Sequence, residues 1–242
     1  MQNRFAMDSL LISAASGMAA RSESLDMLAN NIANSGTAGF KADREFYNLF
    51  QSQLPLVQSQ WTDYSQSTLT PTGNPLNLGL TGPGFFALNS PTGVVYTRNG
   101  QFQISKNNQL QTVEGYTLRN SMDQGKPIVV DPAQSIEIDK AGVVRQDGQV
   151  VGQVEIAGID NPQAMLSKLG TSYFAMMDPA TATKSSPSTE VEQGTLEQSN
   201  VAPADAAVHL VSVMRQFEML QKAISVGTEM NKHALEEVAR PS

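Results

Sequence analysis

The sequence predicts an α+β protein in which both ends of the chain form long helices and the middle forms an antiparallel, β-rich domain. Apolar residues recur with a seven-residue period near the N-terminus and again near the C-terminus. Between these regions the pattern changes to short alternating runs separated by turn signals. The first pattern is typical of helices that pack along their length, and the second is typical of short strands.

The N-terminal helix is expected between residues 7 and 34. Its apolar residues recur with a heptad period at Leu11, Ala14, Met18, Leu25, Leu28 and Ile32. Because such a repeat places these side chains on one face, it requires a partner helix along its length. Ser35 and Gly36 predict the end of the helix, since glycine favours the backbone conformation that terminates helices.

The C-terminal helix is expected to begin at Pro203, which suits the first helical position, and to extend to Val238. Asp205 then lies in the first turn, where the helix dipole favours a negative charge. The heptad positions of this helix are Leu210, Val213, Phe217, Leu220, Ile224, Ala234 and Val238. We therefore expect the two terminal helices to form a coiled-coil stem.

A second apolar stripe lies beside the first on the C-terminal helix, at Val208, Val211, Met219, Ala223, Val226 and Met230. One partner helix covers one stripe, and each exposed Val or Met forgoes about 1.5–3 kcal/mol relative to burial. Arg21, Gly227 and Asn231 also weaken the heptad seam. We predict that both helices are largely disordered in the free monomer and fold on association with other chains. The alternative is a helical bundle already complete in the monomer.

The β-rich domain is expected over residues 76–178, beginning with the alternation of Leu76, Leu78 and Leu80. Turn signals such as Asn99-Gly100 and Asp147-Gly148 separate its short strands. The flanking stretches 37–75 and 179–200 are predicted to be connectors, because residues 51–73 are rich in Gln, Ser and Thr and residues 178–200 are rich in Ser, Thr and Pro. Residues 1–36 and 201–242 would together form the terminal helical domain.

The composition argues against several functional classes. A net charge of -7 without a basic cluster argues against nucleic-acid binding. The absence of cysteine excludes disulfides and thiolate nucleophiles. Asp205 and His209 share a helix face, but this spacing is common by chance, so a hydrolase is a remote alternative. We expect no enzymatic activity, no cofactor and no small-molecule substrate. Arg4 precedes an apolar segment, yet the heptad continues through it, which argues against a cleaved signal peptide.

Several motifs resemble those of the flagellar basal-body rod and hook proteins. The N-terminal motif is LANNIAN at residues 28–34, followed by Gly39-Phe40-Lys41. Further motifs are TGNPLNL at 72–78, GPGFF at 82–86, YTRNGQF at 96–102 and LEQSNV at 196–201. The set follows the order of the family over nearly the whole chain.

The resemblance implies a structural subunit that self-assembles helically with other axial proteins of the rod and transmits torque. It also implies export through the flagellar type III apparatus without a cleaved signal, and a location in the periplasm-spanning rod of the basal body. The length and the opening Met7-Asp-Ser-Leu10 favour a proximal-rod subunit over a distal-rod or short hook-type subunit. Outside the family, the alternative is a secreted β-domain binding module with a coiled-coil dimerisation stem.

The residues expected at assembly interfaces combine the helical seam with the family motifs. They are Leu11, Met18, Leu25, Leu28, Asn31, Ile32, Phe40, Leu210, Val213, Phe217, Leu220, Ile224 and Met230. The resemblance favours an intersubunit hydrogen bond for the amide of Asn31 over an ordinary place near a helix end.

Overall fold

The computed structural model describes residues 2–47, 57–178, 184–186 and 188–238. The chain divides into two units, which we call the helical unit and the β unit. The helical unit comprises residues 1–33, 43–61 and 202–242, and the β unit comprises residues 34–42 and 62–201. The expected α+β class, with helices at both ends and an antiparallel β-rich middle, is confirmed.

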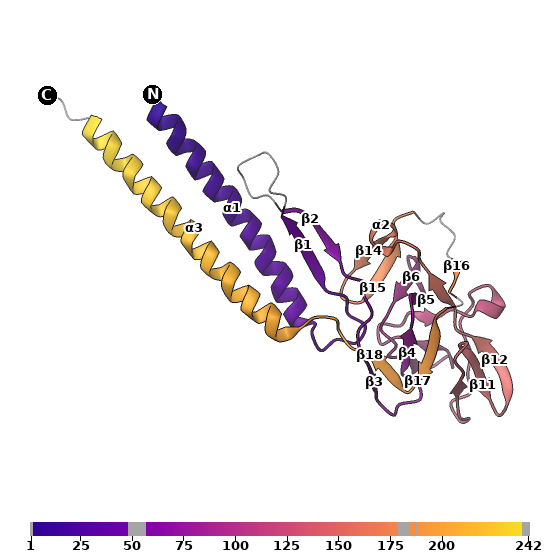
Figure 1. Cartoon of the computed structure of the whole chain (residues 1–242). Helices are drawn as coiled ribbons and strands as arrows, with labels where there is room; N and C mark the ends of the chain where they lie inside the picture. Colours follow the sequence, from indigo (N-terminus) through magenta and orange to yellow (C-terminus); the bar gives the residue numbers. More distant parts are fainter. Residues whose placement is uncertain (1, 48–56, 179–183, 187, 239–242) are drawn as a thin grey trace. The chain divides into compact units, whose positions relative to one another are not determined.

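The helical unit is built on two long helices that lie side by side, α1 (Gln2–Ala33) and α3 (Pro203–Val238) (Figure 1). As expected, α3 begins at Pro203 and carries Asp205 in its first turn. α1 begins earlier than the expected residue 7. Two strands, β1 (Asp43–Tyr47) and β2 (Val57–Thr62), pair with each other, and β1 contacts α1.

In its described residues, the β unit contains many short strands and two short helical segments. Its elements are β3 (Leu69–Pro71), β4 (Leu78–Thr81), β5 (Gly84–Ser90), β6 (Gly93–Thr97), β7 (Gln103–Ile104), β8 (Leu110–Gln111), β9 (Thr117–Leu118), η1 (Ser121–Asp123), β10 (Glu137–Ile138), β11 (Val143–Gln146), β12 (Gln149–Gln153), β13 (Ile156–Gly158), α2 (Pro162–Met165), β14 (Leu166–Leu169), β15 (Tyr173–Met176), β16 (Lys184–Ser185), β17 (Glu190–Gln193) and β18 (Thr195–Glu197).

The largest sheet has the strand order β14-β15-β6-β5-β9-β8-β7, and β13 pairs with both β5 and β16. A separate sheet has the order β10-β11-β12, while β17 pairs with β4 and β18 with β3. All these ladders are antiparallel. Stretches expected to be connectors therefore contain strands. Among them, β17 and β18 are short and largely polar. Their partner residues, such as Thr81 for Glu190, lie far away in the sequence, so no local period marked these two strands.

Strand β5 lies between two groups of apolar side chains. Phe86 and Leu88 belong to the larger core on one face, whereas Phe85 and Ala87 belong to a smaller cluster on the other. Because successive side chains of a strand point to opposite faces, a strand buried on both sides reads as an unbroken apolar run. In the smaller cluster, the ring of Phe85 stands edge-on to that of Phe174, with 5.8 Å between the ring centres.

Tyr173 is buried in the larger core but keeps a polar partner. Its hydroxyl donates a hydrogen bond to the carboxylate of Glu114, and its ring stands edge-on to that of Tyr116 at 5.0 Å. Burial, followed by the hydrogen bond to Glu114, raises the pKa of the Tyr173 phenol above its ordinary value of 10.0. Both effects favour the neutral phenol, since a buried phenolate would lose its hydration and face a carboxylate.

We expect Tyr173 to stay protonated well above pH 10 in the folded chain. A folded-state pKa raised above the unfolded value stabilises the fold fully below pH 10 and ceases to do so as the pH rises through the folded-state pKa. Titrations of the absorbance at 295 nm should differ between the parent and Tyr173→Phe by a single step above pH 10. If the step that Tyr173→Phe loses occurs at or below pH 10 in the parent, this assignment is contradicted.

Candidate assembly surface

Helices α1 and α3 pack against each other at several of the expected heptad positions. Val213 is buried and packs with Met27 and Leu28, and the half-buried Leu25 and Leu210 extend the same cluster. The covered positions of α3 then continue with a spacing of three and four residues at Ala206, Leu210, Val213, Gln216, Phe217, Leu220, Ile224 and Gly227. This spacing places one face of α3 against a neighbouring helix along several turns.

A second side of α1 is also covered, and here the side chains are small or polar. Its buried positions are Gly17, Ala20, Ser24 and Asn31. The hydroxyl of Ser24 donates to a carboxylate oxygen of Glu45 at 2.6 Å. The amide of Asn31 donates to the main-chain oxygen of Asp43 at 2.7 Å and accepts from its N–H at 3.0 Å. The amide expected to bond between subunits therefore makes two hydrogen bonds with β1 of its own chain.

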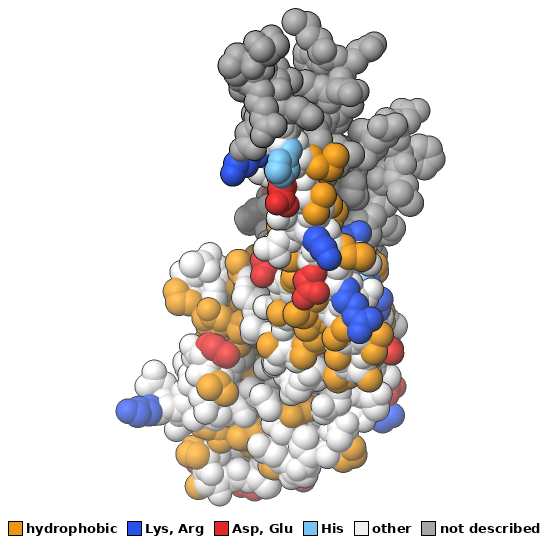
Figure 2. Space-filling model, turned by 90° about the vertical axis from the view of Figure 1, so that its left-hand side faces the viewer, with side chains coloured by type: hydrophobic (Ala, Val, Ile, Leu, Met, Phe, Trp, Pro, Cys, Tyr) orange, Lys and Arg blue, Asp and Glu red, His pale blue; other side chains and the backbone are white. Residues whose placement is uncertain are grey.

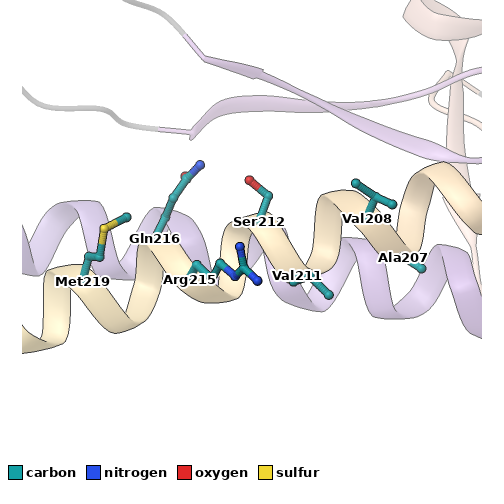
Figure 3. Close-up of a pocket in the computed structure, with 7 residues that line it drawn as sticks. All are labelled: Ala207, Val208, Val211, Ser212, Arg215, Gln216 and Met219. Carbon is teal, nitrogen blue, oxygen red and sulfur yellow. The ribbon is translucent and has the colours of Figure 1, made fainter.

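The outer side of α3 is apolar and exposed. Val208 is 73% exposed and Met230 is 55% exposed, and the other large apolar side chains exposed among the described residues of α3 are Val211, Met214, Met219 and Val226. Seven residues of α3 line an open groove of roughly 600 Å³ (Figure 3): Ala207, Val208, Val211, Ser212, Arg215, Gln216 and Met219. Figure 2 shows hydrophobic side chains among charged ones on the face that it turns to the viewer. The second apolar stripe of α3, which the sequence predicts, is thus exposed in the single chain.

The remaining residues expected at interfaces occupy different environments. Met18, Ile32, Phe217, Leu220 and Ile224 are half-buried within the helical unit. Phe40 is fully buried in the β unit, where the ammonium of Lys168 lies 4.2 Å from the centre of its ring. The backbone of Leu11 lies in α1, and its side chain lies outside the described residues. Asp205 and His209, the pair considered for catalysis, are both exposed on α3.

The β unit contains a buried carboxylate shared by two cations. Glu197 accepts from the ammonium of Lys41 at 2.7 Å and from Nη1 of Arg98 at 3.2 Å, and all three side chains are at most 3% exposed. The Lys41 ammonium also donates to the main-chain oxygen of Ser65 at 2.6 Å, and Nη2 of Arg98 donates to that of Gly82, also at 2.6 Å. We call these three side chains the Glu197 cluster.

Electrostatics of the Glu197 cluster depend on the shared carboxylate. Burial lowers the pKa of Lys41 and of Arg98, and Glu197 opposes this effect at both groups. No local sequence pattern predicts the cluster, because Lys41 and Glu197 are 156 positions apart. The available signal was that each of its residues is a charged group inside one of the recognised motifs.

Gly39 approaches the main chain beside the cluster. Its φ of +66° lies in the left-handed region, and a Cβ atom there would lie 2.3 Å from the carbonyl carbon of Arg98. Glycine alone combines this backbone conformation with so close an approach. The glycine of the Gly39-Phe40-Lys41 motif is therefore required by the path of the segment that presents Lys41.

Three parts of the chain match models of known protein families. Residues 11–41 match the model described as flagella basal body rod protein, and residues 79–146 match the flagellar hook protein FlgE/F/G D1 domain. Residues 192–237 match the C-terminal model of flagellar basal body rod FlgEFG proteins. The flagellar basal-body rod protein FlgF of Mesorhizobium japonicum is 31% identical over 87% of this chain and 89% of its own length.

The chain belongs to the flagellar basal-body rod protein family. The FlgF protein of Caulobacter vibrioides is 29% identical over 89% of this chain and 92% of its own length. The FlgG protein of the same organism is 30% identical over 91% of this chain and 95% of its own length. The resemblance first seen in the motifs is therefore confirmed, and this rod-family chain is a structural protein. None of its described helices is long and apolar enough to span a membrane.

Replacing Glu197 with Gln should destabilise the fold by about 3–5 kcal/mol, because Lys41 and Arg98 would lose the carboxylate that offsets their burial. Urea unfolding of the full chain measures this loss. Glu190→Gln is the matched control, because its ion pair with Lys140 lies at the surface and should contribute little. Equal urea midpoints for the two variants would contradict the role given to the Glu197 cluster.

Proposed function

We propose that this rod-family protein assembles helically with other axial proteins of the flagellar basal body and transmits torque through the resulting rod. The observation that supports the proposal is the exposed apolar stripe of α3. Six large apolar side chains exposed on one helix favour association, because each contributes about 1.5–3 kcal/mol if a neighbour buries it. Rim positions such as Arg215 and Glu218 would then set the orientation of that neighbour.

We further propose that the seam of α1 and α3 is a coiled coil that forms the inner layer of the rod. Leu25, Leu28, Leu210 and Val213 would hold the two helices of one subunit together. Val211, Met219 and Met230 would contact neighbouring subunits, because they lie outside the seam and are exposed. The half-buried Met18, Phe217 and Ile224 are proposed to belong to the seam and to lie at its border with a neighbour.

A proximal position in the rod is proposed from the similarity to FlgF proteins, and a distal position is the alternative, because the FlgG relatives are almost as similar. Complementation separates the two. Expression of this chain should restore motility in a strain that lacks FlgF, and restoration only in a strain that lacks FlgG would favour the distal position.

Export through the flagellar type III apparatus without a cleaved signal, and residence in the periplasm-spanning part of the rod, complete the proposal. The heptad that runs from Leu11 to Ile32 supports an uncleaved N-terminal segment, because removal of its first turns would shorten the seam. N-terminal sequencing of the protein recovered from basal bodies tests this point directly.

Polar substitution of the exposed stripe should impair assembly without unfolding the subunit. Val211→Asn combined with Met219→Gln should raise the protein concentration needed for polymerisation at least about tenfold, because both side chains would lose apolar burial at the contact. Sedimentation of mixtures with other rod proteins measures this concentration, and thermal unfolding checks the fold.

The matched control is Val150→Asn, which replaces an exposed Val of the β unit. Equal polymerisation of the double variant and the parent would contradict the assembly role of α3. Formation of a dimer or another small closed oligomer, in place of a growing polymer, would favour a dimerisation stem instead.

In dilute solution we expect the terminal helices to be weakly protected against amide hydrogen exchange and to become protected on assembly. A seam interrupted by Arg21 and Gly227 is marginal without neighbours. Amides of residues 11–32 should show protection below about tenfold in the monomer, well under that of the β unit. Strong protection throughout residues 11–32 would instead support a bundle that is complete in the monomer.

A further inference from the structure

The chain passes between the two units at four places, after residues 33, 42, 61 and 201. Within the β unit, three segments adjoin these four places. Residues 34–42 adjoin two of them, and residues 62–67 and 197–201 adjoin one each. We call them the connecting segments. Their structure within the β unit determines whether the chain leaves this unit at one place or at several.

Main-chain hydrogen bonds join the connecting segments to one another. The N–H of Gly39 donates to the oxygen of Glu197 at 2.8 Å, and the N–H of Asn200 donates to that of Phe40 at 3.3 Å. The N–H of Asp63 donates to the oxygen of Ala42 at 2.8 Å. The first segment is thus bonded to both of the others.

The side chain of Asn200 contacts the other two segments at once. Its Oδ1 accepts from the N–H of Ala42 at 2.7 Å, and its Nδ2 donates to the main-chain oxygen of Asp63 at 2.7 Å. An amide carries both a donor and an acceptor, and this geometry uses both. Asp at this position could only accept, and Ala could do neither.

The Glu197 cluster joins the same three segments from the buried side. Glu197 belongs to the third segment, Lys41 to the first, and the N–H of Ser67 in the second donates to Oε1 of Glu197 at 2.8 Å. Arg98 extends the connection to β4, because its Nη1 donates to the main-chain oxygen of Leu80 at 3.5 Å. Two polar side chains therefore hold the connecting segments together: the buried carboxylate of Glu197 and, three positions later, the half-buried amide of Asn200.

We propose that Asn200 is a positioning residue that holds the three connecting segments at one place on the β unit. When its amide is removed, the segments separate locally while the main sheet stays folded. Gly39 and Asp63 report this separation well, because their N–H groups bond to main-chain oxygens that a substitution at Asn200 does not remove. The proposal depends on contacts inside the β unit and is independent of the proposed function.

Residue-resolved amide exchange of the full-length chain, followed by NMR, tests the proposal. In Asn200→Ala, the amides of Gly39 and Asp63 should exchange about 10- to 100-fold faster, as expected for a local opening that has lost two hydrogen bonds. The amides of Leu110 and Ile128, which bond within the core of the β unit, should exchange at the parent rate.

Two further variants make the result specific. Asn200→Asp keeps the acceptor for Ala42 but loses the donor to Asp63, so Asp63 should exchange faster while Gly39 stays closer to the parent. Asn161→Ala removes an exposed asparagine that caps α2 and should leave both amides unchanged. Equal acceleration at Gly39, Asp63, Leu110 and Ile128 would indicate general destabilisation and overturn the proposal. Unchanged exchange at Gly39 and Asp63 would overturn it as well. The Glu197 cluster would then hold the connecting segments together without a contribution from Asn200.

Discussion

The β unit is organised around the carboxylate of Glu197, which is buried between Lys41 and Arg98. A buried carboxylate is stable only when hydrogen bonds and opposite charges replace the water that it loses. Glu197 meets this condition by accepting from two cations and from the N–H of Ser67. Because its partners Lys41, Ser67 and Arg98 are far from Glu197 in the sequence, these contacts bring distant segments of the chain together. It also accounts for Gly39, because the segment that carries Lys41 passes against the main chain of Arg98.

The helical unit relies on a different kind of contact. Its seam is aliphatic and modest, and Val213 is the buried residue that the described side chains of α3 contribute to it. The second covered side of α1 combines small residues with two polar side chains, Ser24 and Asn31, that bond to β1. These hydrogen bonds fix the position of the strand along the helix, which a purely apolar contact would leave less defined. In this unit, apolar burial and specific hydrogen bonds act on different sides of the same helix.

The sequence predicts features that follow from patterns within a short stretch of residues. It does not predict features that depend on contacts between residues far apart in the chain. Both terminal helices followed from heptads, and α3 begins at Pro203 as expected. The apolar run Phe85-Phe86-Ala87-Leu88 in β5 can be read from the sequence alone, because a strand buried on both faces needs no alternation. By contrast, β17 and β18 are polar and are defined by pairing with β4 and β3, more than a hundred positions earlier. The second stripe of α3 could be read from spacing alone, whereas the Glu197 cluster could not.

The unequal use of the two long helices affects how such a protein can change over evolutionary time. At Ala20 or Ser24, a bulkier side chain would have to displace parts of the same molecule, because these positions are buried. On the outer side of α3, positions such as Val208 and Met219 touch little of their own chain. Residues there can be exchanged with small effects on folding. If α3 carries the proposed contacts with neighbours, partner preference and subunit architecture can diverge separately, the first through one face of α3 and the second through the covered sides of α1.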